Sequence, residues 1–436
     1  MVRLSGMPKG ILDDILARLP DKDAAKTIVL SKTWRHTWYS FPNISVDGEY
    51  FFTEDDIPVG NDQRFSKLDN LSDYVTKRLL RLRDQDLAIK KFKLSLFGSL
   101  KNPTLIYRHL DQWILMACET GVKVLELCVG ANEGKWYDLP VCVIEAKSLV
   151  KLELGYGIRI GKEFLKHSMK LSSVKMLSLS RVLFAQEGDM EHFISLFPLT
   201  EHLTIYHGYL HNHLCTILRP MIVPLESLFL HGLQKLKEVD LQGIQEVHID
   251  SPNLKNLRSE PFILLAPFKL NFDSCTTLRS LALFNLKSFD IVDKFFAELF
   301  SKHPFLESLK IYKCHVSDER INISSAQLKV LEIMFCPFLK EVNIDAPNLL
   351  SCYYAVDDKP PVISFMRSSN LLEVKVNTIV DFRYFYSMRE FIWNIPQKIL
   401  ASLSLLLIGH FVIMIIHTCL NCMKFPPFLQ VSNIWR

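Results

Sequence analysis

The sequence predicts an α/β protein in which a short three-helix unit is followed by a solenoid with a parallel concave β-sheet. Two observations support this prediction. Apolar residues recur with helical spacing through the first forty residues, and the pattern L-x-x-L-x-L, with other apolar residues substituting, returns from about residue 89 onward. The composition, with 49% hydrophobic and 22% charged residues, is that of an ordinary folded chain.

The N-terminal unit is expected to contain three short helices. Pro8 suits the first turn of the first helix, where a backbone N–H is not needed, and Pro20 ends that helix. Asp21 can cap the second helix, and Ser31 can cap a third helix that carries Trp34. Because three helices of this length bury little surface, we expect the unit to pack against something else.

Over roughly residues 5–44 the sequence resembles the F-box of plant F-box/leucine-rich-repeat proteins. The family usually has Leu where this chain has Met7, which has a similar volume. The resemblance implies docking on the Skp-family adaptor of a cullin–RING ubiquitin ligase, with Leu16 and Leu19 facing the adaptor and Trp34 as an anchor. The adaptor-binding residues that it implies are Met7, Pro8, Ile11, Leu12, Ile15, Leu16, Leu19, Pro20, Leu30 and Trp34. The alternative is that this apolar stripe packs only against the rest of the chain.

The middle of the chain consists of leucine-rich repeats. Each unit offers one short strand that cannot bury its own leucines, so stacking of successive units makes a continuous core. From residue 122 onward the units begin 21 to 29 residues apart, which is the period of this repeat. The units begin at residues 89, 122, 149, 174, 200, 225, 254, 278, 306, 328, 349, 371 and 400.

Two further features of the repeats can be predicted. Two units carry the full signature, which places Cys314 and Cys336 where the chain turns off the strand, as buried structural residues. The segment 235–249 holds two further apolar triplets, which we interpret as extra extended arcs inside one long repeat.

The scattered cysteines favour a reducing compartment, the nucleus or cytoplasm, and charged residues interrupt any N-terminal signal sequence.

The expected domains are an F-box over 1–44, a linker and amphipathic helix over 45–88, the solenoid over 89–409 and an atypical hydrophobic tail over 410–436. A further helix near 107–120 is expected to stop at a glycine and to turn Trp113, Ile114 and Ala117 inward. In the linker helix the apolar face is Leu68, Leu71, Val75, Leu79 and Leu82, and the solvated face carries Lys77, Arg78, Arg81 and Arg83. That basic face lies among acidic residues and is not a nucleic-acid patch.

The C-terminal run of apolar residues from Ile399 to Ile416 is long enough to be a candidate membrane span. His410 interrupts it, and the triplet that begins at Leu400 fits the register of the repeat. We therefore interpret it as a last strand followed by a truncated or aberrant end, on a chain of the F-box/LRR or F-box/FBD/LRR type. A membrane helix is the alternative.

No catalytic, metal or cofactor motif is found in the sequence, so we expect neither an enzyme nor a cofactor. Four histidines (His202, His207, His211 and His213) lie close together, but with a spacing that matches no standard zinc site. Cys419 and Cys422 form a Cys-x-x-Cys pair, but the sequence has no second such pair to complete a zinc site.

The function expected from the resemblance is that of a substrate-recognition subunit of a Skp–cullin–F-box ubiquitin ligase, which the adaptor links to cullin and RING proteins. The alternative is a repeat scaffold that binds a partner without its degradation. Because side chains alternate along a strand, the residues between the leucines are expected to face the concave sheet and to bind an unknown target protein. The residues selected are His202, Thr204, Tyr206, Phe229, His231, Phe284, Lys310, Tyr312, Glu332, Met334 and Tyr353.

Overall fold

The structure is a computed structural model of the 436-residue chain, and it separates into two compact units. The first comprises residues 1–223 and 232–236, and the second comprises 224–231 and 237–436. The structure describes residues 7–48, 61–96, 104–131, 135–166, 173–186, 188–207, 225–261, 268–286, 293–316, 318–337, 339–356, 361–368, 370–378 and 403–407.

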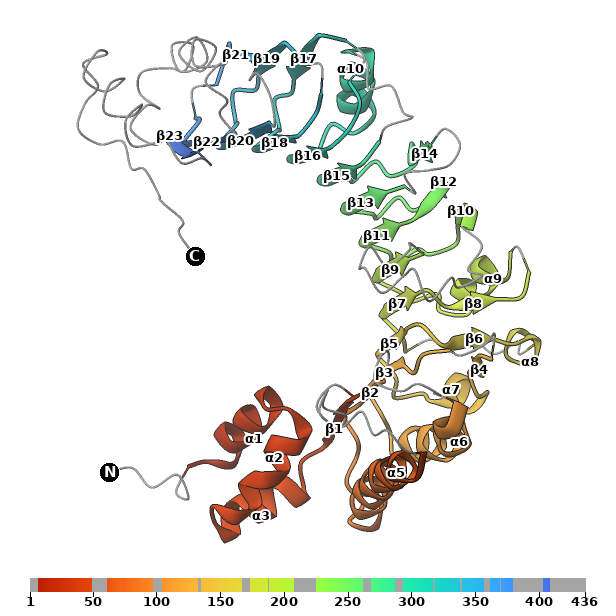
Figure 1. Cartoon of the computed structure of the whole chain (residues 1–436). Coiled ribbons are helices and arrows are strands. Elements are labelled where there is room, and N and C mark those ends of the chain that lie inside the picture. Colours follow the sequence, from red (N-terminus) through yellow and green to blue (C-terminus); the bar gives the residue numbers. More distant parts are fainter. Residues whose placement is uncertain are drawn as a thin grey trace. The chain divides into compact units, whose positions relative to one another are not determined.

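The first unit begins with the expected short helices (Figure 1), namely α1 Lys9–Arg18, α2 Asp21–Lys26, the 3₁₀ helix η2 Thr27–Val29 and α3 Lys32–Tyr39. The hydroxyl of Ser31 caps α3 by accepting a hydrogen bond from the N–H of Trp34 at 3.2 Å. Asp21 does not cap α2, because it is the first residue of the helix and its carboxylate is turned inward to Tyr74. A small apolar core closes this part of the chain and contains Leu12, Leu16, Ala24, Trp34, Trp38 and Phe41.

A parallel sheet follows in the first unit, with one strand for each repeat. Its strands are β1 Asn43–Asp47, β2 Lys91–Ser95, β3 Val124–Cys128, β5 Lys151–Leu154, β7 Met176–Ser180 and β9 His202–Tyr206. The sheet therefore starts before residue 89: β1 pairs in parallel with β2, although it offers only two inward apolar residues, Ile44 and Val46. A second short sheet contains β4 Tyr137–Asp138, β6 Ile158–Ile160 and β8 Leu183–Phe184.

The helices that follow α3 in the first unit bury apolar residues. They are α5 Asn61–Asp84, α6 Thr104–Glu119, α7 Cys142–Glu145, α8 Lys162–Leu165 and α9 Asp189–Ser195. The predicted inner residues of α5 and α6 are all buried. Gly121 ends α6 with φ +80°, and the next N–H, of Val122, donates back to the carbonyl of Ala117 at 3.1 Å.

The second unit continues the same architecture. Its main parallel strands are β11 Glu238–Gln242, β13 Asn256–Glu260, β15 Ser280–Phe284, β16 Ser308–Tyr312, β18 Val330–Met334, β20 Ser351–Val356, β22 Glu373–Thr378 and β23 Leu403–Leu407. One three-stranded sheet holds β10 Leu225–Leu230, β12 Ile244–Ile249 and β14 Lys269–Asn271. Another holds β17 Arg320–Ser324, β19 Glu341–Asp345 and β21 Val362–Phe365, and the helix α10 spans Asp293–Lys302.

One pair of strands is exchanged relative to the sequence prediction. The triplet at 225–230 was expected in the main sheet and the triplet at 236–241 in an extra arc. In the structure β10 belongs to a three-stranded sheet and β11 belongs to the main sheet. The prediction failed because both kinds of strand bury alternate apolar residues, so the alternation alone does not identify the sheet.

The C-terminal prediction is confirmed where the structure describes it. Residues 403–407 form β23, which pairs in parallel with β22 in the predicted register of a last repeat. Residues 379–402 and 408–436, which include the rest of the candidate membrane span and the cysteine pair at 419 and 422, lie outside the described residues. Among the helices that the structure describes, none is long and apolar enough to cross a membrane.

Candidate interaction surfaces

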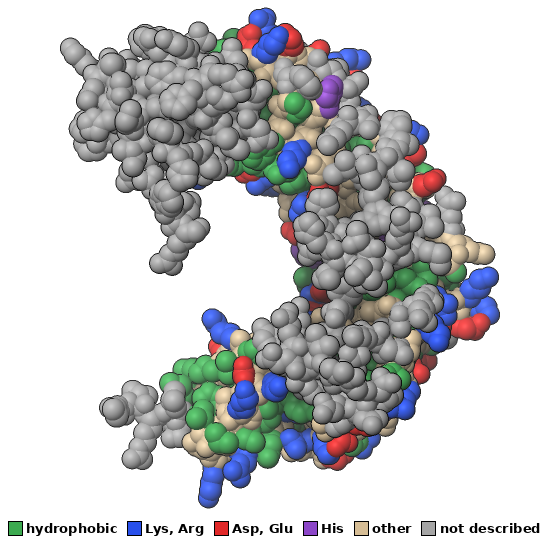
Figure 2. All heavy atoms as spheres, viewed as in Figure 1, with side chains coloured by type: hydrophobic (Ala, Val, Ile, Leu, Met, Phe, Trp, Pro, Cys, Tyr) green, Lys and Arg blue, Asp and Glu red, His purple; other side chains and the backbone are tan. Residues whose placement is uncertain are grey.

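An exposed apolar surface lies on the N-terminal helices, where Figure 2 shows apolar side chains gathered. Ile11 is 49% exposed, Leu19 36%, Val29 79% and Leu30 55%, and Pro8 is also exposed. Such side chains are costly to leave in water, and a contiguous apolar patch marks an interaction site. We call this set, Pro8, Ile11, Leu19, Val29 and Leu30, the N-terminal patch.

Three of the predicted adaptor-binding residues do not face outward. Leu12, Leu16 and Trp34 are at most 3% exposed and form the core that joins α1 to α3. The apolar stripe on α1 is wide enough to supply two rows. Leu12 and Leu16 form the inner row, and Ile11 and Leu19 lie on the outer one. The expectation that Leu16 faces the adaptor is therefore corrected, since it supports the patch from within. Met7, Ile15 and Pro20 are half-buried.

A buried polar cluster attaches the N-terminal helices to α5. The Arg78 side chain is 2% exposed, which corrects its expected place on a solvated face. Its guanidinium donates hydrogen bonds to the carbonyls of Trp38 at 2.9 Å, Phe41 at 3.2 Å and Asn43 at 3.2 Å, and it lies 3.9 Å from the centre of a Trp38 ring. These carbonyls follow or end α3, so Arg78 satisfies acceptors that the helix leaves unpaired. Burial lowers the pKa of Arg78, although nearby Asp21 opposes this.

Asp21 and Tyr74 complete this cluster. The Tyr74 hydroxyl donates a hydrogen bond to the Asp21 carboxylate. Burial raises the pKa of Asp21, while the bond from Tyr74 and the charge of Arg78 act in the opposite direction. We call Asp21, Tyr74 and Arg78 the buried clamp. No sequence motif announces it, because its three members lie on α2 and α5, more than fifty residues apart in the chain.

The exposed face of the sheet in the first unit carries a chain of charges. Glu126 on β3 contacts Lys91 on β2 and Lys151 on β5, each at 2.8 Å. Burial alone would raise the pKa of Glu126, but the hydrogen bonds from Lys151 and Lys91 outweigh it and hold the pKa below its ordinary value. His202 and Tyr206 lie on the same face of β9, half-buried and alternating with buried residues as predicted.

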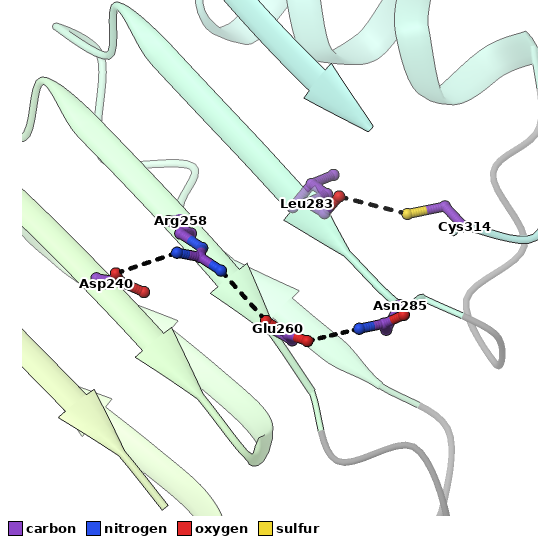
Figure 3. A network of polar contacts seen from close by, with 6 residues as sticks. All are labelled: Asp240, Arg258, Glu260, Leu283, Asn285 and Cys314. Carbon is purple, nitrogen blue, oxygen red and sulfur yellow. Dashed lines mark hydrogen bonds and ion pairs between the residues drawn. The ribbon is translucent and has the colours of Figure 1, made fainter. Parts of the chain in front are cut away.

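In the second unit the exposed face of the main sheet holds the network of Figure 3. The Arg258 guanidinium lies 3.7 Å from the Asp240 carboxylate and 3.3 Å from that of Glu260. It also lies 4.4 Å from the centre of the Phe284 ring. Asn285 donates from its side chain to Glu260 at 2.5 Å. A cation, two carboxylates and an amide are therefore held together across three neighbouring strands.

The other predicted residues of this face lie on adjacent strands in register. Phe284 and Tyr312 are paired in the ladder and their ring centres are 5.5 Å apart, and Tyr312 is in turn paired with Met334. Lys310 forms an ion pair with Glu332 at 2.9 Å. Glu332 is paired with Tyr353. The structure thus brings together six of the predicted target-binding residues, from Phe284 to Tyr353, but their role in binding stays a proposal.

Phe229 and His231 lie elsewhere. Because β10 belongs to the three-stranded sheet, both line a surface pocket of about 390 Å³ beside β12 and β14. Phe229 is 46% exposed, and its ring stacks on that of His248 with centres 4.8 Å apart. The prediction that these two residues continue the row of the main sheet is therefore wrong, for the reason given for β10.

The cysteines of the full repeats occupy the predicted structural position. Cys314 and Cys336 are buried, and the Cys314 thiol contacts the carbonyl of Leu283 in the preceding repeat at 3.6 Å (Figure 3). Burial raises the pKa of Cys336 to about 11, so its thiol stays protonated at neutral pH. Within the described ranges no three potential ligands gather as a metal site; His211 and His213 lie outside those ranges.

Comparison with known proteins finds one family model that matches the N-terminal part of the chain and one that matches its C-terminal part. The F-box domain matches residues 4–45, and the family described as "At1g61320/AtMIF1, LRR domain" matches residues 265–408. An FBD-associated F-box protein of Arabidopsis thaliana is 26% identical over 412 residues, which cover 92% of this chain and 78% of the relative.

Two further relatives come from the same plant. An F-box/FBD/LRR-repeat protein is 29% identical over 55% of this chain and 53% of its own length. An F-box/LRR-repeat protein is 30% identical over 47% of this chain and 41% of its own length. The chain thus spans about half the length of these two relatives, and both parts predicted from the sequence, a short helical domain and a repeat domain, have counterparts in them.

Proposed function

Because this chain carries an F-box followed by leucine-rich repeats, as plant F-box/LRR proteins do, we propose that it is a substrate-recognition subunit of a Skp–cullin–F-box ubiquitin ligase. The F-box binds a Skp-family adaptor and, through it, cullin and RING proteins. The exposed face of the repeat sheets binds a target protein. The chain itself is non-catalytic and acts in the nucleus or cytoplasm, where its cysteines stay reduced.

The observation that carries this proposal is the N-terminal patch. The helices that display it already have a closed core of their own, so the exposed Ile11, Val29 and Leu30 are not needed to hold them together. Large apolar groups at the centre of an interface contribute much of its binding energy. The buried clamp then ties the bound adaptor to the first repeats, so that a target held by the chain has a high effective concentration near the ligase.

The proposal is tested by replacing exposed residues of the patch rather than its core. The double variant Ile11→Asp, Leu30→Asp should lose co-purification with a Skp-family adaptor by at least tenfold, because two carboxylates would have to be buried at the interface. The far-ultraviolet circular dichroism should match that of the wild type, since both positions are on the surface. Leu115→Asp, at a 44% exposed position on α6, is the matched control and should bind normally.

Equal adaptor recovery by the double variant and the wild type would contradict the proposal. Leu16→Lys does not make this test, because a charge at a position 1% exposed would unfold the helices themselves. The alternative function is a repeat scaffold that does not lead to degradation. It is distinguished by reconstituting the chain with adaptor, cullin and RING protein: a scaffold would bind its partner without transfer of ubiquitin to it.

A further inference from the structure

Four residues directly after strands of the main sheets have left-handed backbone conformations although they are not glycine. They are Arg181, Asn285, Lys313 and Phe335, with φ between 51° and 56°. Each donates its N–H to a carbonyl at or next to the end of the neighbouring strand. For example, Lys313 donates to Met334 at 2.8 Å and Phe335 to Ala355 at 2.7 Å. We call each of these positions a corner. The hydrogen bond that it donates extends the ladder by one bond before the chain turns away from the sheet.

Glycine performs the same task elsewhere in this chain. Gly243 follows β11 with φ +83° and donates its N–H to the carbonyl of Glu260 at 2.7 Å. A side chain at such a corner costs about 1–2 kcal/mol relative to glycine. The backbone therefore does not require Lys313 or Phe335, and strain of this kind often accompanies a functional site.

The side chains at two of these corners return to the exposed face of the second unit. The Phe335 ring meets the Tyr312 ring edge to face with centres 5.5 Å apart, and the Lys313 ammonium lies 5.3 Å from the centre of the same Tyr312 ring. The Phe284 ring also lies near the Tyr312 ring, with the two centres 5.5 Å apart. Together with Met334, these residues make an aromatic surface at the ends of β15, β16 and β18. We call Phe284, Tyr312, Lys313, Met334 and Phe335 the corner surface.

Charge distinguishes Lys313 from its neighbours. Arg258 is paired with two carboxylates, and Lys310 is paired with Glu332. Lys313 is exposed, and within the described residues no carboxylate forms an ion pair with its ammonium. The corner surface therefore combines half-buried rings with one positive charge that no carboxylate among the described residues pairs with.

We propose that the corner surface binds a segment of the target protein in which an acidic residue adjoins a large apolar one. The apolar side chain packs on the rings of Phe284, Tyr312 and Phe335, and the carboxylate pairs with Lys313. Aromatic and methionine side chains are enriched at interfaces, and a charge-assisted hydrogen bond is about twice as strong as a neutral one. This inference rests on the proposed function and names the chemistry of the target.

The test uses a phage library of random twelve-residue peptides, selected on the purified full chain. We expect enrichment of peptides with Asp or Glu next to Phe, Leu, Ile or Trp. Synthetic copies of the enriched peptides are then measured by fluorescence anisotropy. Phe335→Gly and Lys313→Glu should each weaken their binding at least tenfold. Lys313→Arg, which keeps the charge, should stay within about threefold of the wild type.

The matched control is Arg181→Gly. Arg181 occupies the same kind of corner and stacks on a tyrosine, Tyr206, but it belongs to the first unit. Its replacement should leave peptide binding unchanged. Because glycine is at ease in this conformation, Phe335→Gly and Arg181→Gly should fold normally, and the midpoint of thermal unfolding reports this directly.

No enrichment of acidic-apolar peptides, or equal binding by Phe335→Gly and the wild type, would overturn the inference. The co-purification of a Skp-family adaptor, measured on the same variants, reports on the proposed function separately. If the adaptor still binds but peptide binding does not depend on the corner surface, the receptor role stands and the assigned chemistry of the target is wrong.

Discussion

Arg78 links the N-terminal helices to α5 through three hydrogen bonds and a ring contact. It reaches three carbonyls because a guanidinium presents five donors in a planar fork, and it also stacks on Trp38. Its sequence environment gives no sign of this, since Lys77, Arg81 and Arg83 nearby are at least partly exposed. A buried arginine and a solvated one have the same pattern in a helix when the partner surface is made by residues far along the chain.

We predict that Arg78→Lys lowers the free energy of unfolding of the N-terminal helices by about 2–4 kcal/mol. A single ammonium cannot satisfy three carbonyls or stack on the indole in the same way. Hydrogen exchange of peptides from α1 to α3 measures the effect. Arg83→Lys, at an exposed position on the same helix, is the control and should change exchange little. Unaltered exchange in Arg78→Lys would mean that the clamp is not needed.

Glu126 gives the sheet of the first unit a dependence on pH. Its folded pKa lies below its ordinary value of 4.5, so the carboxylate contributes its full stability above pH 4.5. That contribution is lost as the pH falls through the folded pKa. Glu126→Gln should lower the free energy of unfolding by about 1–2 kcal/mol at pH 7, and the difference from wild type should shrink below pH 4.5.

Denaturant titrations between pH 3 and pH 7 measure this difference. Glu153→Gln is the control, because Glu153 contacts the same Lys151 but is 44% exposed, and it should cost less than about 1 kcal/mol. If the effect of Glu126→Gln were constant over the whole range, the carboxylate would not be the group responsible.

At the level of helices and strands, the sequence predicted most elements because each repeat buries its own alternating leucines. The strands beginning near 278, 306 and 328 lie where expected, as does α6 with its glycine stop. Strand β1 was missed, because Ile44 and Val46 are too few for a repeat pattern. The exchange of β10 and β11 was missed because the choice of sheet depends on neighbouring repeats and not on the strand itself.

In the candidate sites, too, the sequence predicted what depends on local pattern and missed what depends on the rest of the fold. The alternation rule placed Tyr312 and Met334 correctly on the exposed face, because that rule is local. It could not place Lys313 and Phe335, whose side chains return to that face only because of their left-handed backbone. Likewise, the pattern on α1 identified the apolar residues of that helix but did not show which of them are buried and which are exposed.

Close stacking of two repeats depends on Gly157, in the turn between β5 and β6. Its φ is +101°, and a Cβ built there would overlap the backbone of Gly130 in the preceding repeat. Gly157→Ala should therefore cost about 2–5 kcal/mol, the sum of backbone strain and overpacking. Thermal and denaturant unfolding measure this loss.

Gly188 is the matched control for that substitution. It has a similar positive φ of +84°, but no atom lies within 4 Å of a Cβ built there. Gly188→Ala should then show the strain alone, about 1–2 kcal/mol. Equal costs for the two substitutions would show that the close approach to Gly130 does not limit the stacking of these repeats.

At the scale of the whole molecule, the repeats contact mainly their neighbours in the ladder, as in β15, β16 and β18. In such an architecture a defect spreads to adjacent repeats and fades with distance. The N-terminal helices depend instead on their own core and on the buried clamp, both in the first compact unit. A destabilising substitution near the corner surface should therefore leave the N-terminal patch intact, and the reverse should also hold.

We predict that Leu309→Ala loosens the second unit without affecting the N-terminal helices. Leu309 is fully buried in β16, and its truncation should cost about 2–5 kcal/mol locally. Hydrogen exchange should accelerate in peptides from β15, β16 and β18 and stay unchanged in α1 to α3, and adaptor binding should be retained. Equal acceleration in α1 to α3 would show that the chain opens as one cooperative body. A variant of the corner surface could then no longer be assumed to leave the F-box intact.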